Sequence, residues 1–534
     1  MPGRSMDYPK DKPRLGFPCD SFVSRLRLLA GMIFLAANFA VADPGSKAAN
    51  GEESVNVLLI AIDDLNDWVG CLGGHPQAHT PNIDRLARRG ILFANAHCPS
   101  TACNPSRAAI FSGKMPWQTG VWNNKSERLF SQQPDSLVFP RHLKRHGYQT
   151  MGTGKLMHSS GSANRLMFDD SYNPEQRWSP FTKSQVRYRK DEQASKATAN
   201  PSHQAVLPSG ESIVLPLNRM PSDRRPETND GESFDWGGLN IEEKSMGDRQ
   251  IADWAGEQIQ QMDSALPFLL GVGFYRPHIP LFAPQSYFDR LKDQEIFLPP
   301  VEADDLVDLS ETGQKWAVEA ETAGLHSTVV QYEQWREAVK GYLACTTFVD
   351  AQVGRLIDSL DASPFADNTL VVLFSDHGWH LGEKQHWGKW TGWERSTRVP
   401  LVIVPPRGRA SDFASAGTTR RQPVSLIDLY PTLCDLCGVP SPDGLDGLSL
   451  VDLLAQEQPS VERYALTVFD RGNVSIRDGR WRYIRYSDGN EELYDLESDP
   501  HEWLNLINKN SSQEVRNRFR VYLASAIQAA PANE

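Results

Sequence analysis

Two short groups of acidic residues and histidine are the first candidates for chemistry. Asp63 and Asp64 directly follow the apolar run 55–62, and Asp376 and His377 follow a similar run. Adjacent carboxylates at the end of a buried strand are costly unless a cation neutralises them. Three carboxylates and one imidazole favour a hard divalent ion, Ca²⁺ or Mg²⁺, whereas zinc sites more often combine His and Cys at motif spacing.

Each group also has an ordinary structural interpretation. Asp63 and Asp64 could cap a helix or lie in a surface loop, and Asp376-His377-Gly378 could form a turn. One such group alone is weak evidence for a site.

A third candidate is Cys103. Pro105 and Gly113 predict a helix over 105–113, because Pro favours the first helical position and Gly follows the last. Cys103 would then precede the helix N-terminus, where unpaired N–H groups and a partial positive charge attract an anion. Arg107, one helical turn further, can face the same place. The alternative is an ordinary cysteine.

The elements that must position these residues alternate between apolar runs and helical patterns. Strands are predicted over 55–62, 91–93, 148–152, 267–274, 370–374 and 401–404, and helices over 81–90, 251–262, 337–360 and 425–437. This order predicts an α/β domain with a mostly parallel central sheet flanked by helices. Polar residues follow four of the strands: Asp63-Asp64, Lys155, His278 and Asp376-His377. Because the carboxyl ends of parallel strands meet at one edge, we expect one site there.

The last part of the chain has a different character. Short strand-like runs over 465–469, 473–477 and 480–486 precede a helix over 513–529. We expect a catalytic domain over 55–458 and a smaller C-terminal α+β domain with a short antiparallel sheet over 459–534. Residues 160–235 are polar and read as a long excursion of the kind that often carries specificity.

The N-terminus has the pattern of a signal peptide. Residues 28–42 are apolar, follow Arg25 and Arg27, and end in small residues, which predicts cleavage after Ala42. An uncleaved anchor is the alternative, but the run is shorter than the ~20 residues of a membrane span. We expect a leader over 1–42, a linker over 43–54 and an exported protein, periplasmic or secreted, with no membrane span in its mature form.

Composition excludes several classes of protein. The 534 residues carry a net charge of −12, which argues against nucleic-acid binding. Seven cysteines are too few for a disulfide scaffold. Cys434 and Cys437 resemble a redox or zinc motif, but they lie on a predicted helix without a partner pair, so we interpret them as small buried side chains.

The stretch Cys103-x-Pro105-Ser106-Arg107 resembles the sulfatase signature, in which the cysteine is converted to formylglycine. Six further stretches resemble that family in order and spacing: NVLLIAIDD (56–64), TPNIDRL (80–86), FANA (93–96), GK (154–155), SDHG (375–378) and LYDLESD (493–499). The resemblance implies an alkaline-phosphatase-like fold. Iduronate-2-sulfatase and its relatives are the most similar branch, through GKLMH (154–158) and YRPHIP (275–280). The chain departs from that branch at His380 and over 384–391.

The resemblance also implies roles for individual residues. A divalent cation, Ca²⁺ rather than Mg²⁺, would be held by Asp63, Asp64, Asp376, His377 and the residue derived from Cys103. Formylglycine at Cys103, hydrated to a gem-diol, would attack sulfur and then release sulfate as the aldehyde reforms. Arg107 would fix the diol, and Lys155 and Lys389 would bind sulfate oxygens. His158 and His278 would bracket the sulfate; the sequence leaves their roles open, and we favour His158 as the acid/base.

The predicted function is hydrolysis of a sulfate ester on a sulfated carbohydrate, such as an iduronate 2-sulfate-like unit or a related polysaccharide unit. The expected partners are that substrate and the formylglycine-generating enzyme, with no nucleic acid. A phosphate or phosphonate monoester hydrolase of the same superfamily is one alternative. A non-catalytic carbohydrate-binding protein on a sulfatase scaffold is another.

Several side chains near Lys389 have weaker interpretations. Four tryptophans could stack on a sugar or pack internally: Trp379, Trp387, Trp390 and Trp393. Two histidines, His380 and His386, could line the pocket or lie at the surface. Two charged residues, Glu394 and Arg398, could bind substrate groups.

Overall fold

The computed structural model describes residues 54–133, 137–158, 160–175, 180–181, 186–187, 203–221, 223, 234–262, 265–319, 324–456 and 462–528. All of them belong to one compact unit, 47–534. The expected leader lies outside the described residues, as does all of the expected linker except Ser54.

An eight-stranded sheet forms the centre of this unit. Its strands, from one edge to the other, are β16 (Thr418–Arg420), β2 (Ile91–Phe93), β15 (Leu401–Val404), β12 (Thr369–Ser375), β1 (Asn56–Ile62), β10 (Phe268–Phe274), β4 (Gln149–Gly154) and β5 (Asp170–Tyr172). β1 pairs in parallel with both β10 and β12, and β15 alone runs against its two neighbours. The predicted mostly parallel α/β sheet is thus confirmed.

The direction of β15 follows from the connection that precedes it. Parallel neighbours need a crossover, usually a helix packed on the sheet. Residues 376–400 contain only the short helix α12 (Glu394–Thr397), the 3-10 turn at Glu383–Gln385 and the small strands β13 (His380–Leu381) and β14 (Trp387–Gly388). The chain therefore stays at the carboxyl end of β12 and returns antiparallel.

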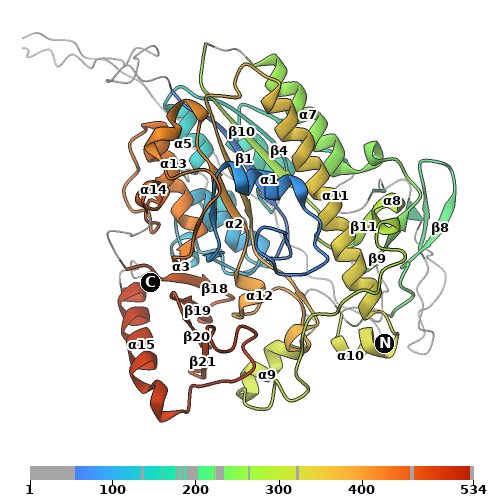
Figure 1. Ribbon diagram of the computed structural model, residues 1–534, viewed down its shortest axis with the longest axis vertical. Helices are drawn as coiled ribbons and strands as arrows, with labels where there is room; N and C mark the ends of the chain where they lie inside the picture. The colour runs from blue at the N-terminus through green and yellow to red at the C-terminus, as the bar shows by residue number, and fades with distance from the viewer. Residues whose placement is uncertain are drawn as a thin grey trace, which may run out of the picture. The chain divides into compact units, whose positions relative to one another are not determined.

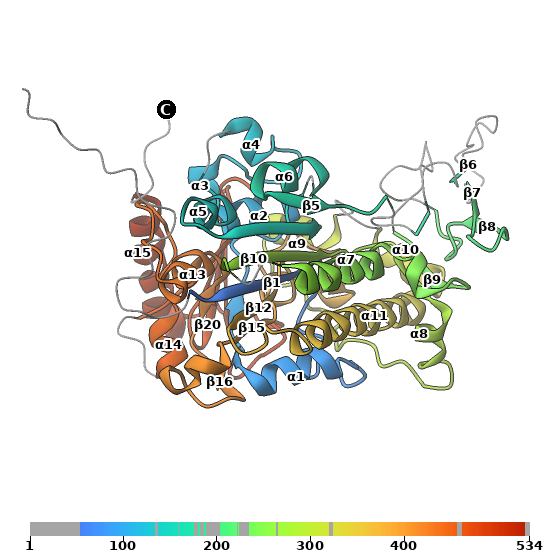
Figure 2. The same cartoon turned by 90° about the horizontal axis from the view of Figure 1, so that it is seen from above.

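Helices cover both faces of the sheet, as Figure 2 shows. α1 (Pro81–Arg89), α7 (Gly247–Gln261) and α11 (Trp335–Asp361) pack against Leu58 and Ile60 of β1. α2 (Cys103–Ser112), α5 (Phe139–Arg145), α13 (Leu429–Cys437) and α14 (Val451–Ala455) pack on the face that carries Leu59. Both faces are apolar because alternate side chains of a central strand point to opposite layers.

A second, smaller sheet follows in the C-terminal part (Figure 1). It consists of the antiparallel strands β18 (Ala465–Val468), β19 (Val474–Arg477), β20 (Trp481–Arg485) and β21 (Glu491–Asp495), and α15 (Gln513–Gln528) packs on it through Phe519 and Leu523. The expected antiparallel C-terminal sheet is confirmed, while the boundary at 458/459 stays a prediction.

The remaining elements are short and surround these two sheets. They are α3 (Pro116–Thr119), α4 (Leu129–Gln132), α6 (Ser160–Met167), α8 (Gln285–Asp289), α9 (Glu311–Val318), α10 (His326–Gln331), β3 (Ala96–His97), β6 (Val186–Arg187), β7 (His203–Val206), β8 (Ser212–Leu215), β9 (Trp236–Leu239), β11 (Leu281–Pro284) and β17 (Val424–Ser425). Within the described ranges, no helix is long and apolar enough to cross a bilayer. The six cysteines found there are all unbridged; Cys434 is buried as expected, whereas Cys437 is only half-buried.

Gly154 ends β4 under a tight steric constraint. Its φ is +68°, and a Cβ added there would lie 2.0 Å from the Gly273 carbonyl oxygen of β10. Only glycine therefore lets the chain turn sharply beside β10 and place Lys155.

We expect Gly154→Ala to lower the free energy of unfolding by about 2–5 kcal/mol, combining the left-handed backbone cost with overpacking. Gly147→Ala is the matched control, because Gly147 also has positive φ (+86°) but no atom lies within 4 Å of the added Cβ. That control should cost about 1–2 kcal/mol. Chemical denaturation of both variants checks this, and equal costs would contradict the steric argument.

Candidate active site

The polar residues predicted at the strand ends do meet at one edge of the central sheet. Asp63 and Asp64 follow β1, Lys155 follows β4, and Asp376 and His377 follow β12. All five side chains are fully buried. Because burial of unpaired charge is costly, these groups must compensate one another or bind an ion.

The turn after β1 is held in an unusual backbone conformation. Asp64 has φ +60°, which is rare for a residue other than glycine. Its N–H donates to Asp376 Oδ1 at 3.2 Å, and its carbonyl accepts the Tyr342 hydroxyl at 2.8 Å. The next N–H, of Leu65, donates to Ser375 Oγ at 2.9 Å. Neighbouring strand and helix therefore fix the direction of the Asp64 carboxylate.

Cys103 is the first residue of α2, with Ala102 as the N-cap, so the prediction that the helix begins at Pro105 was wrong. The physical reason is that the first-turn N–H groups have no helical acceptor, so a proline as the third helical residue loses no bond. Cys103 still lies at the helix N-terminus, buried, as the anion argument requires.

Arg107 links α2 to the acidic turns. Its Nε donates to Asp376 Oδ2 at 2.7 Å and its Nη2 to Asp63 Oδ1 at 3.1 Å. Its Nη1 donates to the carbonyls of Lys155 and Leu156. Arg107 thus sets the spacing between three strand ends, and its contact is with the carboxylates rather than with Cys103 itself.

Two lysines flank the cysteine. Lys389 Nζ lies 3.0 Å from Cys103 Sγ and 2.8 Å from Asp64 Oδ1. Lys155 Nζ lies 3.4 Å from the same sulfur and pairs with Asp63. Burial alone would raise the pKa of the Cys103 thiol, but the charges of Lys155, Lys389 and His377 hold this pKa well below its usual range. The site therefore stabilises negative charge at position 103.

Four side chains offer ligand atoms that could hold a metal ion. Atoms of Asp63, Asp64, Cys103 and His377 all lie within 4.8 Å of one another. His377 Nδ1 lies 3.1 Å from the Gly378 carbonyl, so it carries the proton and leaves Nε2 facing the cluster. Asp64 Oδ2 is buried without a hydrogen-bond partner among the described residues. These donors fit a divalent cation, with Cys Sγ standing where an oxygen of formylglycine would be.

Asp376 lies beside this group and not within it. Its Oδ2 binds Arg107 and lies 3.5 Å from His377 Nε2, while its Oδ1 accepts backbone N–H groups of Asp64 and His377. Its role as a ligand stays a prediction.

His158 and His278 lie on the more open side of the cluster, where both are half-buried. The His158 side chain hydrogen-bonds the Cys103 thiol. His278 Nδ1 lies 2.6 Å from the Ile279 carbonyl, which turns Nε2 to within 3.9 Å of Asp64 Oδ2. The structure thus brings both predicted histidines to the cysteine and its acidic neighbours.

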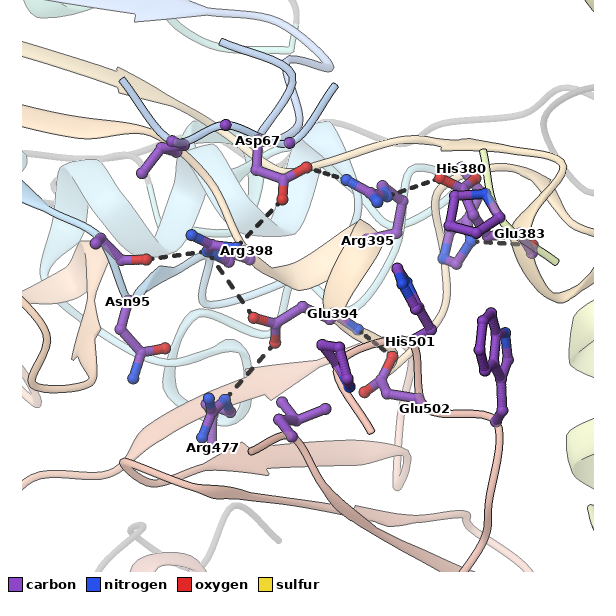
Figure 3. A pocket seen from close by; sticks show the side chains of 18 of the residues that line it. Asp67, Asn95, His380, Glu383, Glu394, Arg395, Arg398, Arg477, His501 and Glu502 are labelled. Atoms are coloured by element: carbon purple, nitrogen blue, oxygen red, sulfur yellow. Dashed lines mark hydrogen bonds and ion pairs between the residues drawn. The ribbon is translucent and has the colours of Figure 1, made fainter. Parts of the chain in front are cut away.

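A pocket of about 450 Å³ lies apart from these residues, and none of the predicted catalytic or metal-binding side chains lines it. Figure 3 shows its charged side chains paired with one another. Glu394 pairs with Arg482 of β20 and lies 3.9 Å from Arg398, which itself binds Asp67. Both side chains are therefore engaged in ion pairs: Glu394 joins the segment of Lys389 to the C-terminal sheet, and Arg398 joins it to Asp67 after β1.

The aromatic and histidine candidates around Lys389 are internal. Trp379, Trp387, Trp390 and Trp393 are all buried, and Trp379 lies under the Lys389 ammonium at 5.5 Å. His386 is buried between the carbonyls of Ala317 and Lys389, and His380 bonds Thr391 Oγ1. The tryptophans therefore pack internally. Neither histidine is at the surface, and His380 lines the pocket of Figure 3.

Sequence reasoning missed two residues that matter here. Tyr342 falls within the helix predicted over 337–360 and was assigned no role, although its hydroxyl donates to the Asp64 carbonyl. Arg128 belongs to no motif, yet its charge acts on both Cys103 and His158. The sequence offers no signal for Arg128, because its loop reaches the site only in the folded chain.

Known proteins resemble the chain along most of its length. A sulfatase of Formosa agariphila is 32% identical over 495 residues, which cover 91% of this chain and 89% of that protein. Human iduronate 2-sulfatase is 29% identical over 432 residues, covering 74% and 71% of the two chains. The solved phosphonate monoester hydrolase of Agrobacterium radiobacter has a TM-score of 0.68 at 21% identity, with 89% and 96% covered, and this likeness concerns the fold alone.

Family models give the same assignment. The family model described as Sulfatase matches residues 55–439. This range contains every predicted catalytic and metal-binding residue. A second model, described as N-sulphoglucosamine sulphohydrolase, C-terminal, matches residues 382–529. The chain therefore belongs to the sulfatase family.

Proposed function

We propose that this sulfatase hydrolyses a sulfate ester on a sulfated carbohydrate, with an iduronate 2-sulfate-like unit as the leading candidate, and that it requires Ca²⁺. The observation that carries the proposal is the position of Cys103. It begins a buried helix, contacts two lysines and lies within 4.8 Å of the ligand atoms of Asp63, Asp64 and His377. This combination suits a nucleophile that must meet an anion.

Each group of residues in the site has a separate role. Lys155 and Lys389 bind sulfate oxygens and offset their charge, because both ammonium groups already point at the position of residue 103. Arg107 holds Asp63 and Asp376 in place. When present, formylglycine at position 103 supplies a hydroxyl nucleophile. Asp63, Asp64, His377 and residue 103, with Asp376 beside them, would hold a divalent ion, which would supply positive charge to offset that of the sulfate.

We assign protonation of the leaving oxygen to His158. Its side chain contacts residue 103 and is half-buried, so it can reach both nucleophile and substrate. His278, turned toward Asp64, is the alternative for this step.

The choice of substrate rests on similarity to iduronate 2-sulfatase over most of both chains. The phosphate or phosphonate monoester hydrolase remains the alternative, since a phosphonate monoester hydrolase shares the fold. A non-catalytic carbohydrate-binding scaffold is disfavoured because every predicted catalytic side chain is present and gathered. Export, as periplasmic or secreted protein, is proposed from the N-terminal pattern alone.

Maturation of Cys103 gives the first test. After expression with a formylglycine-generating enzyme, we expect mass spectrometry to find the peptide containing Cys103 as the aldehyde, and sulfate release to track the converted fraction. Cys103→Ala should abolish turnover, because no nucleophile remains. A fully active protein whose Cys103 is still a thiol would contradict the proposal.

Metal binding gives a test that needs no turnover. We expect Ca²⁺ at about 100 times its Kd to stabilise the protein by about 2.7 kcal/mol relative to EDTA, seen as a higher Tm. Asp64→Asn should remove most of this shift, because it takes one negative charge from the cluster. Asp289→Asn, an exposed acid at the end of α8, is the control and should keep it. Equal shifts in both variants would refute the metal assignment.

The role of His158 can be tested through the leaving group. A general acid matters most when the leaving oxygen is a poor one, so His158→Asn should lower kcat on a sugar sulfate by about 10²–10⁴-fold. Its effect on 4-nitrophenyl sulfate should be much smaller. If His278→Asn shows this leaving-group dependence and His158→Asn does not, the two assignments are reversed.

A further inference from the structure

The loop 122–128 is fastened to the helix that carries Cys103. The N–H of Asn104 donates to Asn124 Oδ1 at 2.9 Å. The Asn104 side chain donates to the carbonyls of Asn123 and Ser126 at 3.2 and 3.1 Å. Because Asn104 follows Cys103 directly in α2, the loop lies against the first turn of that helix and has a fixed place beside the active site.

Arg128 ends this loop and brings a positive charge to the open side of the site. Its Nη1 donates to the Asn124 carbonyl at 3.1 Å, which braces the guanidinium. The guanidinium of Arg128 interacts electrostatically with Cys103 and with His158, and its side chain is half-buried. Among the described residues, no carboxylate pairs with it, whereas Arg107, Lys155 and Lys389 all contact aspartates.

The C-terminal sheet brings a second arginine to the same loop. Figure 1 shows β18 close to α2 and α3, and an isolated bridge joins Ser100 to Val468. In the turn between β18 and β19, Asp470 accepts the Asn123 amide at 3.0 Å and has φ +116°. The guanidinium of Arg471 lies 5.7 Å from the ring centroid of Trp122 and is exposed.

Arg471, like Arg128, has no carboxylate partner among the described residues. The turn of Asp470 is thus held in a rare conformation that places a cation against a half-buried indole. Arg128 and the Trp122 ring therefore lie on one loop beside Cys103, and Arg471 of the turn between β18 and β19 lies against that ring. The loop is tied both to α2 and to this turn of the C-terminal sheet.

We propose that Arg128, with Arg471 on Trp122, forms a rim subsite that binds a second anionic group of the substrate while the scissile sulfate lies at residue 103. The second group is a carboxylate or another sulfate on the same or the adjoining sugar. The guanidinium fork matches either anion, and the indole offers an apolar face to a sugar ring. This inference rests on the proposed sulfatase function and narrows its substrate to polyanionic sugars.

Two pairs of substrates separate the sources of the second charge. One pair is an iduronate 2-sulfate glycoside and its carboxyl methyl ester. The other is glucosamine 6-sulfate carrying either an N-sulfate or an N-acetyl group. In each pair the scissile sulfate is the same. The wild-type enzyme should show a KM about tenfold or more lower for the dianionic member of at least one pair, as expected for a charge-assisted hydrogen bond.

Arg128→Gln should remove that preference by raising the KM of the dianionic substrate, with little change in kcat and little effect on its neutralised partner. Arg471→Gln should act in the same direction. Arg485→Gln, an exposed arginine of β20, is the charge-matched control and should behave as wild type. Binding of the same substrate pairs to Cys103→Ala, measured by calorimetry, should show the same preference without turnover.

The inference is overturned if the wild type does not distinguish either pair, or if Arg128→Gln affects both members of a pair equally. Absence of sulfate release from all four compounds by enzyme with verified formylglycine would instead overturn the proposed function.

Discussion

Burial of charge at the carboxyl edge of the central sheet is the constraint on which the rest of this structure depends. Asp63, Asp64 and Asp376 are fully buried, and so are Arg107, Lys155 and Lys389. Taking such groups out of water is stable only where their geometry is closely matched. Short contacts among these groups offset the free-energy cost of removing them from water. Asp64 Oδ2 is left without a hydrogen bond among the described residues. The same matched cluster surrounds Cys103, so the structural requirement and the chemical one concern the same atoms.

The fold supplies this matching from elements that are distant in sequence. β1, β4 and β12 are parallel and end at one edge, which brings positions 63, 155 and 376 together. The antiparallel return into β15 leaves residues 376–400 at that edge, where Lys389 reaches Asp64. The C-terminal sheet then secures this segment from outside, because Arg482 binds Glu394 and Ser475 Oγ donates to the Gly392 carbonyl. The smaller sheet thus supports the site without contributing one of its predicted ligands.

Much of this arrangement was predictable from the sequence, for identifiable reasons. Apolar runs and their spacing predicted the central strands, and the expected parallel sheet predicted that Asp63 and His377 would meet at one edge. The direction of β15 was not predictable, because it depends on what the connecting segment does in space. The sequence could not show whether the tryptophans near Lys389 stack on a sugar or pack internally; their burial in the structure shows that they pack internally. Arg128 had no signal at all, since its position depends on Asn104 and Asn124 meeting across a turn. Long-range polar contacts of this kind leave no periodic pattern in a sequence.

This buried cluster is expected to cleave sulfate esters in preference to phosphate esters. The most direct test is kcat/KM for 4-nitrophenyl sulfate and 4-nitrophenyl phosphate, measured on one preparation with verified formylglycine and Ca²⁺. We predict that the sulfate ester is preferred by at least about tenfold, equivalent to ~1.4 kcal/mol of transition-state stabilisation. Efficient turnover of the phosphate ester with no turnover of the sulfate ester would contradict this account.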